Sequence, residues 1–398
     1  MICYIISNHY SFYLHWNQKM KKISSVSHVA LALALSTQPS LSAEWNVVVG
    51  GEYVSYFGFA NSDISTNSAS DFDGFDVKSD VTIAFMPEIT LDNGIQFGAV
   101  VEVDGQDASV GDSFAFIDAS FGMFEIGSRP SAGYNMFYSA PDESILGTND
   151  GSSGDFIPFD GQAGSVFTGN DTELGTLNST FIENGSGNND NAQRISYYTP
   201  RLAGFQLGFS YARDPQSTQN NQVDLNGNAL NNLFDFGANY VQDFGGVEVA
   251  IAGRYGIAQN DTVGGTNPEL WGAGANVSVA GFTIGGSFAE QNNAGVSDGQ
   301  AYDVGVSYST GPWAMSLVYQ YGTNADDEQA NGALNVPAGS DEELQQFVAG
   351  VTYELAQGVA VGGFAAYVDF DEDVADSGAA GGDDVDGFII GGGIALEF

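Results

Sequence analysis

The stretch from residue 388 to residue 398 alternates between two faces without interruption. One face would carry Phe388, Ile390, Gly392, Ile394, Leu396 and Phe398. The other face would carry Ile389, Gly391, Gly393, Ala395 and Glu397. Successive side chains of a strand point to opposite faces, so this pattern predicts a β-strand with a continuous apolar face. At the end of an exported chain, such a strand is typical of a transmembrane β-barrel, and Phe398 is a candidate assembly signal.

The first 43 residues have the layout of a secretory signal peptide. From Met20 the chain has two lysines, an apolar run over 29–35 and small residues ending at Ala43. The run is shorter than the roughly 20 residues that a membrane helix needs. We therefore expect translation from Met20, cleavage after Ala43 and a single domain over residues 44–398.

Removal of this leader changes the chemistry that the chain can perform. The cysteine and all three histidines lie within residues 1–43, and six basic residues remain against 50 acidic ones. A mature chain of this composition has no disulfide and no histidine for catalysis or metal binding. Its negative charge excludes nucleic acid as a partner and favours cations over anions.

Short and long connections alternate along the rest of the sequence. The short, turn-rich ones are at 91–94, 120–122, 199–201, 243–246, 280–281, 310–312 and 356–358. The long, polar ones are near 59–74, 105–112, 131–192, 213–231, 258–268, 291–299, 322–343 and 371–386. Seven short and eight long connections predict an all-β, antiparallel, sixteen-stranded transmembrane barrel. A soluble β-sandwich, with its apolar faces turned inward, is the alternative that alternation alone leaves open.

The charged residues of the expected strands are sorted to one face. In residues 247–255, Glu248 and Arg254 share the face opposite Val249 and Ile251. A basic residue facing lipid near the membrane midplane costs about 2–4 kcal/mol, which explains the sorting. Residues 359–370 break the alternation near Gly362 and Gly363, and we interpret the break as a β-bulge.

Two segments resemble a known family. Residues 114–129, reading FAFIDASFGMFEIGSR, resemble the strand–turn–strand before the third loop of Gram-negative general diffusion porins, and residues 194–205, reading RISYYTPRLAGF, resemble the strand and turn after it. The resemblance implies a sixteen-stranded outer-membrane barrel that forms a homotrimer and lets small hydrophilic solutes diffuse passively. It also implies a third loop, here 131–192, that folds into the lumen and sets the constriction. Ser128 stands where the family usually has arginine, and its loop-tip motif is matched only loosely at 156–161.

In such a pore, acids on the loop would face bases on the wall. The wall candidates, inward by parity, are Lys78, Arg129, Arg194 and Arg254. The loop candidates are Asp142, Glu143, Asp150, Asp155 and Asp160. Each base could instead anchor a strand end through a salt bridge, and each acid could be a solvated surface carboxylate. The scarcity of bases predicts a cation-preferring channel.

Acidic loops also raise the question of calcium. Candidate ligands near the end of the chain are Asp371, Asp373, Asp383 and Asp384. Oxygen ligands at close spacing suit a hard cation, but no complete twelve-residue EF-hand loop is present. Solvated charge is the alternative, and divalent bridging to anionic lipid is a third. We expect that no cofactor is required.

The expected partners and functions follow from the barrel. The partners are a second and third copy of the chain, outer-membrane lipid and lipopolysaccharide, and the machinery that assembles outer-membrane barrels. A channel selective for one solute, such as a sugar, or a structural or adhesive barrel acting through its long loops are the alternative functions. An enzyme is not expected, because the Ser-His route is excluded and no motif supports an active site of carboxylates alone.

Overall fold

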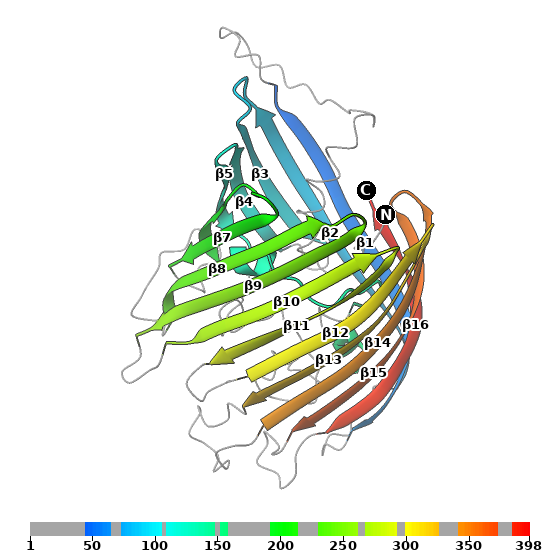
Figure 1. The fold of residues 1–398 in the computed structure, drawn as a ribbon. Helices are drawn as coiled ribbons and strands as arrows, with labels where there is room; N and C mark the ends of the chain where they lie inside the picture. Colours follow the sequence, from blue (N-terminus) through cyan, green and yellow to red (C-terminus); the bar gives the residue numbers. More distant parts are fainter. Residues whose placement is uncertain are drawn as a thin grey trace.

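The computed structural model describes residues 44–64, 73–105, 109–147, 152–157, 192–213, 230–261, 267–292, 299–325, 341–372 and 384–398. Within these residues, sixteen antiparallel strands form one closed barrel (Figure 1). Residues 1–43 lie outside this part of the chain, so the leader and its cleavage after Ala43 remain predictions.

The strands follow one another around the barrel in chain order. They are β1 (Asn46–Ile64), β2 (Gly74–Thr90), β3 (Gln96–Asp104), β4 (Val110–Ala119), β5 (Gly122–Ser128), β6 (Gln193–Tyr198), β7 (Phe205–Ala212), β8 (Leu230–Asp243), β9 (Val247–Asn260), β10 (Glu269–Val279), β11 (Phe282–Asn292), β12 (Gly299–Thr310), β13 (Trp313–Ala325), β14 (Asp341–Ala356), β15 (Val359–Glu372) and β16 (Val385–Glu397). Each strand pairs with its neighbours in sequence, and β1 closes the ring by pairing with β16. The predicted strand count and the all-β class are confirmed, whereas the connections do not strictly alternate in length, because 91–95 and 105–109 are equally long.

The seam between the first and last strands extends to the final residue. The backbone N–H of Gly51 donates to the carbonyl of Phe398 at 3.0 Å, and the N–H of Phe398 donates to the carbonyl of Gly51 at 3.1 Å. Closing the ring satisfies backbone groups that an open sheet edge would leave unpaired in lipid. The end of the chain is therefore part of what makes the barrel continuous.

The outside of the barrel is apolar and the inside is mixed. On β13, Leu317 points outward with 53% of its surface exposed, whereas its neighbour Val318 is completely buried on the inner face. On β9, Ile251 is half-exposed outside, while Arg254 is buried inside. This is the reverse of a soluble sandwich and is the arrangement of a barrel whose outer face lies in lipid.

Two details of the predicted strands were wrong. The register runs through Gly362 and Gly363 without interruption, and the irregularity on β14 lies between Glu354 and Ala356. The alternation seemed to break because the inner face of β15 is itself apolar, with Phe364 and Phe370 buried inside the barrel. The first long connection is also shorter than predicted, because Asn61 to Ile64 still pair with β16 and β1 therefore ends at Ile64.

Helices are a minor part of the described chain. The α-helix α2 (Ala132–Asn135) and the 3-10 helix η1 (Ser152–Asp155) both belong to the connection between β5 and β6. No helix among the described residues is both long enough and apolar enough to cross a membrane.

Candidate pore constriction

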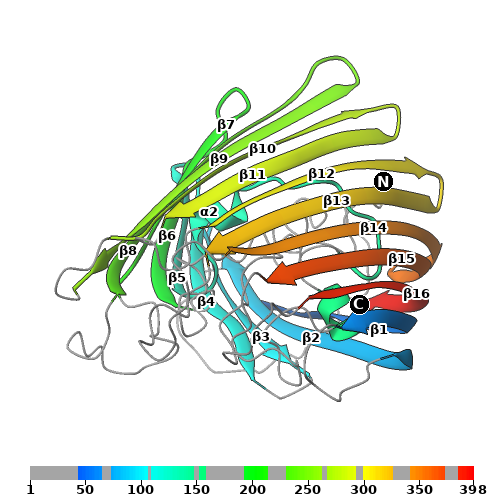
Figure 2. The ribbon, with the colours of Figure 1, turned by 90° about the horizontal axis from the view of Figure 1, so that it is seen from below.

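The connection between β5 and β6 turns into the barrel. We call its described residues, 129–147 and 152–157, the inner segment. Figure 2 shows α2 and η1 of this segment within the ring of strands. Ser131 caps α2, because its side-chain oxygen accepts a hydrogen bond from the backbone N–H of Tyr134 at 3.2 Å.

The start of the inner segment is fixed to β7 and β8. The backbone N–H of Ala132 donates to Oγ of Ser210 at 2.7 Å, and that of Gly133 donates to Oδ1 of Asp235 at 2.6 Å. The first N–H groups of a helix have no acceptor within the helix. Here polar side chains on the barrel wall supply the missing acceptors. Side chains of the wall thus complete the hydrogen bonding of α2.

The middle of the inner segment is fixed to β13 and β14. The backbone N–H of Glu143 donates to Oγ of Ser316 at 2.8 Å, and its carbonyl accepts from Oγ1 of Thr352 at 2.7 Å. The Ser316 hydroxyl also lies 2.9 Å from Oδ1 of Asp142, which accepts from the N–H of Ser144 at 2.8 Å. Asp142 and Glu143 are therefore buried participants in the attachment of the loop.

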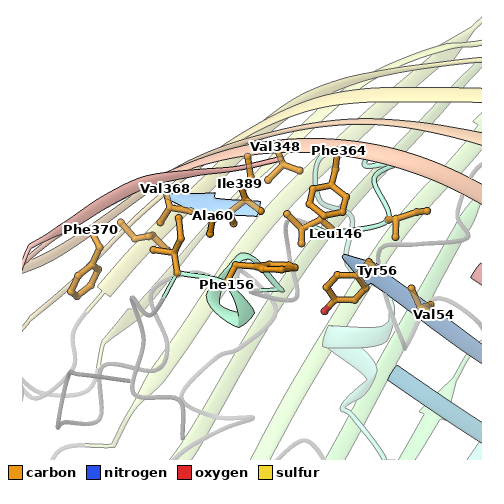
Figure 3. Packing of buried hydrophobic residues seen from close by; sticks show 14 of the residues in the cluster. Val54, Tyr56, Ala60, Leu146, Phe156, Val348, Phe364, Val368, Phe370 and Ile389 are labelled. Carbon is orange, nitrogen blue, oxygen red and sulfur yellow. The ribbon is translucent and has the colours of Figure 1, made fainter. Parts of the chain in front are cut away.

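The end of the inner segment packs into a hydrophobic cluster inside the barrel. Phe156 and Ile157 follow η1 and are buried together with Tyr56, Phe364 and Ile389 of β1, β15 and β16 (Figure 3). The ring centroids of Tyr56 and Phe156 are 5.9 Å apart. Full burial of one such side chain contributes about 1.5–3 kcal/mol, so the cluster holds the segment against this part of the wall.

A series of glycines on the inner wall makes room for the inner segment. In the described residues, a Cβ atom would collide with or crowd the segment at Gly58, Gly208, Gly237, Gly272, Gly274, Gly305, Gly350, Gly362 and Gly387. At Gly350, an added Cβ would lie 2.5 Å from Cα of Ser144. These contacts follow the segment from β7 to β16 and β1, nearly in chain order. The segment approaches closely with its backbone at Gly237, Gly274 and Gly350 and with its side chains at the other positions, which explains why these inward positions carry no side chain.

The inner wall of β1 to β3 is more open. Glu52, Asp80, Glu102 and Asp104 are half-exposed, and their strand partners place them on the inner face beside the buried Val54 and Ala84. Asp142 of the inner segment and Asp235 on the wall are almost completely buried. Water therefore reaches the carboxylates on the first three strands and is excluded from those between the segment and the wall.

The structure places the four predicted wall bases inside the barrel, in different surroundings. Arg129 forms a buried ion pair with Glu125 and lies 4.4 Å from the ring centroid of Phe114. Arg254 forms a buried ion pair with Asp235 at 3.1 Å and donates to Oγ of Ser131 at 3.3 Å.

The other two bases differ in exposure. Arg194 is buried, and its Nε lies 3.4 Å from the carbonyl oxygen of Ala192. Lys78 is partly exposed, forms an ion pair with Asp76 at 2.7 Å and lies 5.8 Å from the ring centroid of Phe156. Lys78 is thus the predicted base that lies beside the end of the inner segment.

The predicted loop acids also differ in their surroundings. Asp142 and Glu143 are buried as described, whereas Asp150 and Asp160 lie outside the described residues. Asp155 is half-exposed and accepts a hydrogen bond from the hydroxyl of Tyr56. Burial raises the pKa of Asp155 above its ordinary value, and the Tyr56 hydrogen bond and the charge of Lys78 partly offset that rise. Lys78 and Asp155 are the predicted wall and loop residues that come together.

Several residues of this site were not predicted from the sequence. They are Glu125 and Asp235, which pair with the buried arginines, Tyr56, and the acids of the open wall. The pairing of Glu125 with Arg129 could have been predicted from the sequence, because strand alternation places residues 125 and 129 on the same face. Asp235 lies one strand away from Arg254, so its partner depends on register, which the sequence pattern does not give.

The predicted calcium ligands are only partly described. Asp371 and Asp384 are exposed at the ends of β15 and β16, and Asp373 and Asp383 lie outside the described residues. Among the residues that the structure describes, no group of three or more candidate ligands could hold a metal ion.

A closed antiparallel barrel with an apolar exterior and a connection packed against its inner wall defines a class of membrane protein, the transmembrane β-barrels of porin type. Comparison with known families agrees: residues 29–373 match the family described as Gram-negative porin. The chain belongs to this family and is a protein of the bacterial outer membrane.

Solved structures show the same fold at low sequence identity. A porin refined at 1.8 Å resolution is 16% identical and has a TM-score of 0.56, with 89% of this chain and 100% of that chain covered. An anion-selective porin from Comamonas acidovorans is 18% identical with a TM-score of 0.54 and the same coverage. OmpT, an outer membrane protein of Vibrio cholerae, is 15% identical with a TM-score of 0.53, with 89% of this chain and 98% of that chain covered.

A curated relative is more similar in sequence over a shorter length. An uncharacterized protein of Rickettsia bellii is 28% identical over 243 residues, which are 54% of this chain. The match spans about half, 52%, of the length of that relative.

Proposed function

We propose that this porin is a passive diffusion channel for small hydrophilic solutes and ions, with a preference for cations. The observation that carries the proposal is the half-exposed row of Glu52, Asp80, Glu102 and Asp104 on the inner wall of β1 to β3. Lys78 is the one basic residue in the described parts of β1 to β4. Diffusing ions would therefore meet a wall that carries mostly negative charge.

The buried arginines do not oppose this preference. Arg129 and Arg254 are each paired with a carboxylate beneath the inner segment, so each pair has little net charge toward the lumen. Low-dielectric walls focus the field of the acids that remain in contact with water. Lys78 opposite Asp155 would supply a local transverse field at the constriction, while Arg194, Asp142 and Glu143 would support the loop.

Reversal potentials in a salt gradient across a planar bilayer test the preference. We expect the wild-type channel to favour cations, and the triple variant Asp80→Asn, Glu102→Asn, Asp104→Asn to lose most of that preference. A matched control neutralises three acids at strand ends, Asp371, Asp384 and Asp386, and should behave like the wild type. Anion preference in the wild type, or equal losses in both triple variants, would contradict the proposal.

Two further measurements separate the proposal from its alternatives. Raising the salt to 1 M shortens the Debye length to about 3 Å and should weaken the preference. Liposome swelling with sugars of graded size should depend on size alone; a strong preference for one sugar would instead indicate a solute-selective channel. Absence of conductance would favour a structural or adhesive barrel. The proposal involves no catalytic step.

The proposed assembly is a homotrimer. A solved structure of Vibrio cholerae OmpT described as a trimer form has a TM-score of 0.53 and 13% identity with this chain, which supports the proposal through the fold alone. A heat-resistant band of three crosslinked copies on a denaturing gel would be the expected result. A band of one copy after efficient crosslinking would rule the trimer out.

We further propose three features of the surroundings of the barrel. The outer face would contact lipid and lipopolysaccharide, and the assembly machinery would handle the unfolded chain. Calcium would have at most an auxiliary role at Asp371 and Asp384. Adding EDTA should therefore leave the melting temperature and the conductance of the barrel unchanged; a clear decrease in either would establish a required divalent ion.

A further inference from the structure

An arginine that the pore proposal does not use lies at the short turn between β6 and β7. The guanidinium of Arg201 is exposed and donates to three oxygens: the carbonyl of Gly204 at 2.7 Å, Oε1 of Gln206 at 2.9 Å and Oδ1 of Asn239 at 2.8 Å. Its planar fork of donors suits several acceptors at once, which a lysine cannot serve in the same way. Arg201 therefore connects its own turn to the inner face of β8.

The contact with Asn239 continues to the inner segment. Asn239 is buried, and its Nδ2 donates to the carbonyl of Met136 at 3.2 Å. Met136 is the residue that ends α2, and carbonyls at a helix end have no partner within the helix. Two hydrogen bonds in sequence, Arg201 to Asn239 and Asn239 to Met136, thus link an exposed turn to the end of α2.

The other end of α2 has a matching attachment. Arg254 donates to Oγ of Ser131, the residue that caps the start of α2. The body of the helix lies against Gly208 and Gly237, where added Cβ atoms would crowd Ala132, Gly133 and Met136. Arg254 acts directly at the start of α2, and Arg201 would act through Asn239 at its end.

We propose that Arg201 is a positioning residue of the channel, which holds the start of the inner segment in place through Asn239 and the carbonyl of Met136. This role of Arg201 depends on the proposed function only for the readout that measures conductance. Without Arg201, Asn239 loses the partner that orients its amide, and the attachment of Met136 loosens. The barrel strands keep their own hydrogen bonds, so the change should be confined to the inner segment.

The test uses four variants of the full barrel: Arg201→Lys, Arg201→Gln, Asn239→Ala and the double variant Arg201→Gln, Asn239→Ala. Arg213→Gln is the matched control, because it removes the same charge from an exposed residue at the other end of β7. The first readout is amide hydrogen exchange of residues 132–140, which does not depend on conductance. The second readout is the noise of the open single channel, and the third is thermal unfolding of the barrel.

We expect both Arg201 variants to accelerate exchange over 132–140 about tenfold, the change expected when a hydrogen bond to a charged group is lost. Open-channel noise should increase in the same variants, while the melting temperature stays that of the wild type. Asn239→Ala should match them, and the double variant should show no larger effect, because both changes break one chain of contacts. Arg213→Gln should resemble the wild type in all three readouts.

Different results would overturn the proposal. Wild-type exchange in Arg201→Lys would show that the charge alone matters, and additive effects in the double variant would show that Arg201 does not act through Asn239. A lower melting temperature with unchanged exchange over 132–140 would indicate a general structural role. If the wild type does not conduct, the proposed function fails, while the exchange measurements still decide the role of Arg201.

Discussion

The hydroxyl of Tyr56 donates a hydrogen bond to the carboxylate of Asp155, which lies 99 positions further along the chain. This contact joins the first strand of the barrel to the end of the inner segment. It also lies beside Lys78, whose positive charge lowers the pKa of Asp155, whereas the charges of Asp80 and Asp76 raise it. The ionisation of Asp155 therefore depends on burial and on these neighbouring groups.

The first prediction concerns the pH dependence of the proposed cation preference. Burial is the largest influence on Asp155 and raises its pKa above the ordinary 3.8, so this carboxyl takes up a proton at a higher pH than a solvated aspartate. As pH falls, the channel should lose part of its cation preference before solvated acids titrate. Tyr56→Phe removes a hydrogen bond to the ionised form, so the pH of this loss should move upward. Reversal potentials measured from pH 7 down to pH 3 would record it.

The same shift has a consequence for stability. Because the pKa is higher in the folded protein, the protonated carboxyl favours folding; the contribution is present below pH 3.8 and is lost as pH rises through the raised pKa. Asp155→Asn should remove both the early loss of preference and this pH dependence. An unchanged titration of preference in Asp155→Asn would show that other acids of the lumen account for it.

The second prediction concerns the close approach of the inner segment to the wall. Gly350→Ala would place a methyl group 2.5 Å from Cα of Ser144, so the segment must move or the strand must deform. Overpacking of this kind typically costs about 1–3 kcal/mol. We therefore expect the free energy of unfolding to decrease by about that amount and the single-channel conductance to change.

The control for this change is a glycine on the outer face. Gly253 faces outward on β9, and an added Cβ there would have its nearest neighbour at 3.9 Å. Gly253→Ala should stay within about 0.5 kcal/mol of the wild type and conduct normally. Equal effects of the two substitutions, measured by thermal unfolding and conductance, would mean that the segment does not depend on its contact with Gly350.

The features of the fold that depend on turn residues and on strand alternation were predictable from the sequence. Turn residues such as those at 91–94 and 280–281 divide the sequence into strands, and the parity of a strand places Arg254 on the inner face. These signals work because a strand alternates its side chains and a tight turn requires particular residues. Sequence alone was therefore enough for the barrel, its strand count and the side on which its bases lie.

The features that depend on distant contacts were not predictable. The apolar inner face of β15 looked like a bulge because Phe364 is covered by Phe156, which comes from a connection far earlier in the chain. Glu143 was predicted to face bases across the pore, with a solvated carboxylate as the alternative, but it is buried and its backbone bonds Ser316 and Thr352, 173 and 209 positions away. Burial of this kind is set by the path of the inner segment, and no local pattern encodes that path.

The third prediction concerns the buried ion pair at the start of the inner segment. Arg254→Met leaves Asp235 buried beside an apolar side chain and without its counter-charge, while the N–H of Gly133 still donates to its Oδ1 at 2.6 Å. Removing one partner of a buried pair costs about 3–5 kcal/mol, because the other charge stays desolvated. The double variant Arg254→Met, Asp235→Asn should recover much of this loss, since the neutral amide needs no counter-charge. Chemical denaturation of the three proteins would give the comparison, and a double variant as unstable as Arg254→Met would disprove the argument.

The last prediction separates two roles of Phe398. Its backbone closes the seam with Gly51 through two hydrogen bonds, whereas its side chain is 60% exposed on the outer face. Phe398→Ala keeps both backbone bonds, so the melting temperature of a barrel refolded in detergent should change by only a few degrees. If the ring is a signal that the assembly machinery reads, the same substitution should strongly reduce the amount of folded barrel in the outer membrane of cells. Equal amounts of wild-type and variant barrel in cells would show that the aromatic side chain is not required for assembly, and a large loss of stability in detergent would show instead that the ring supports the seam itself.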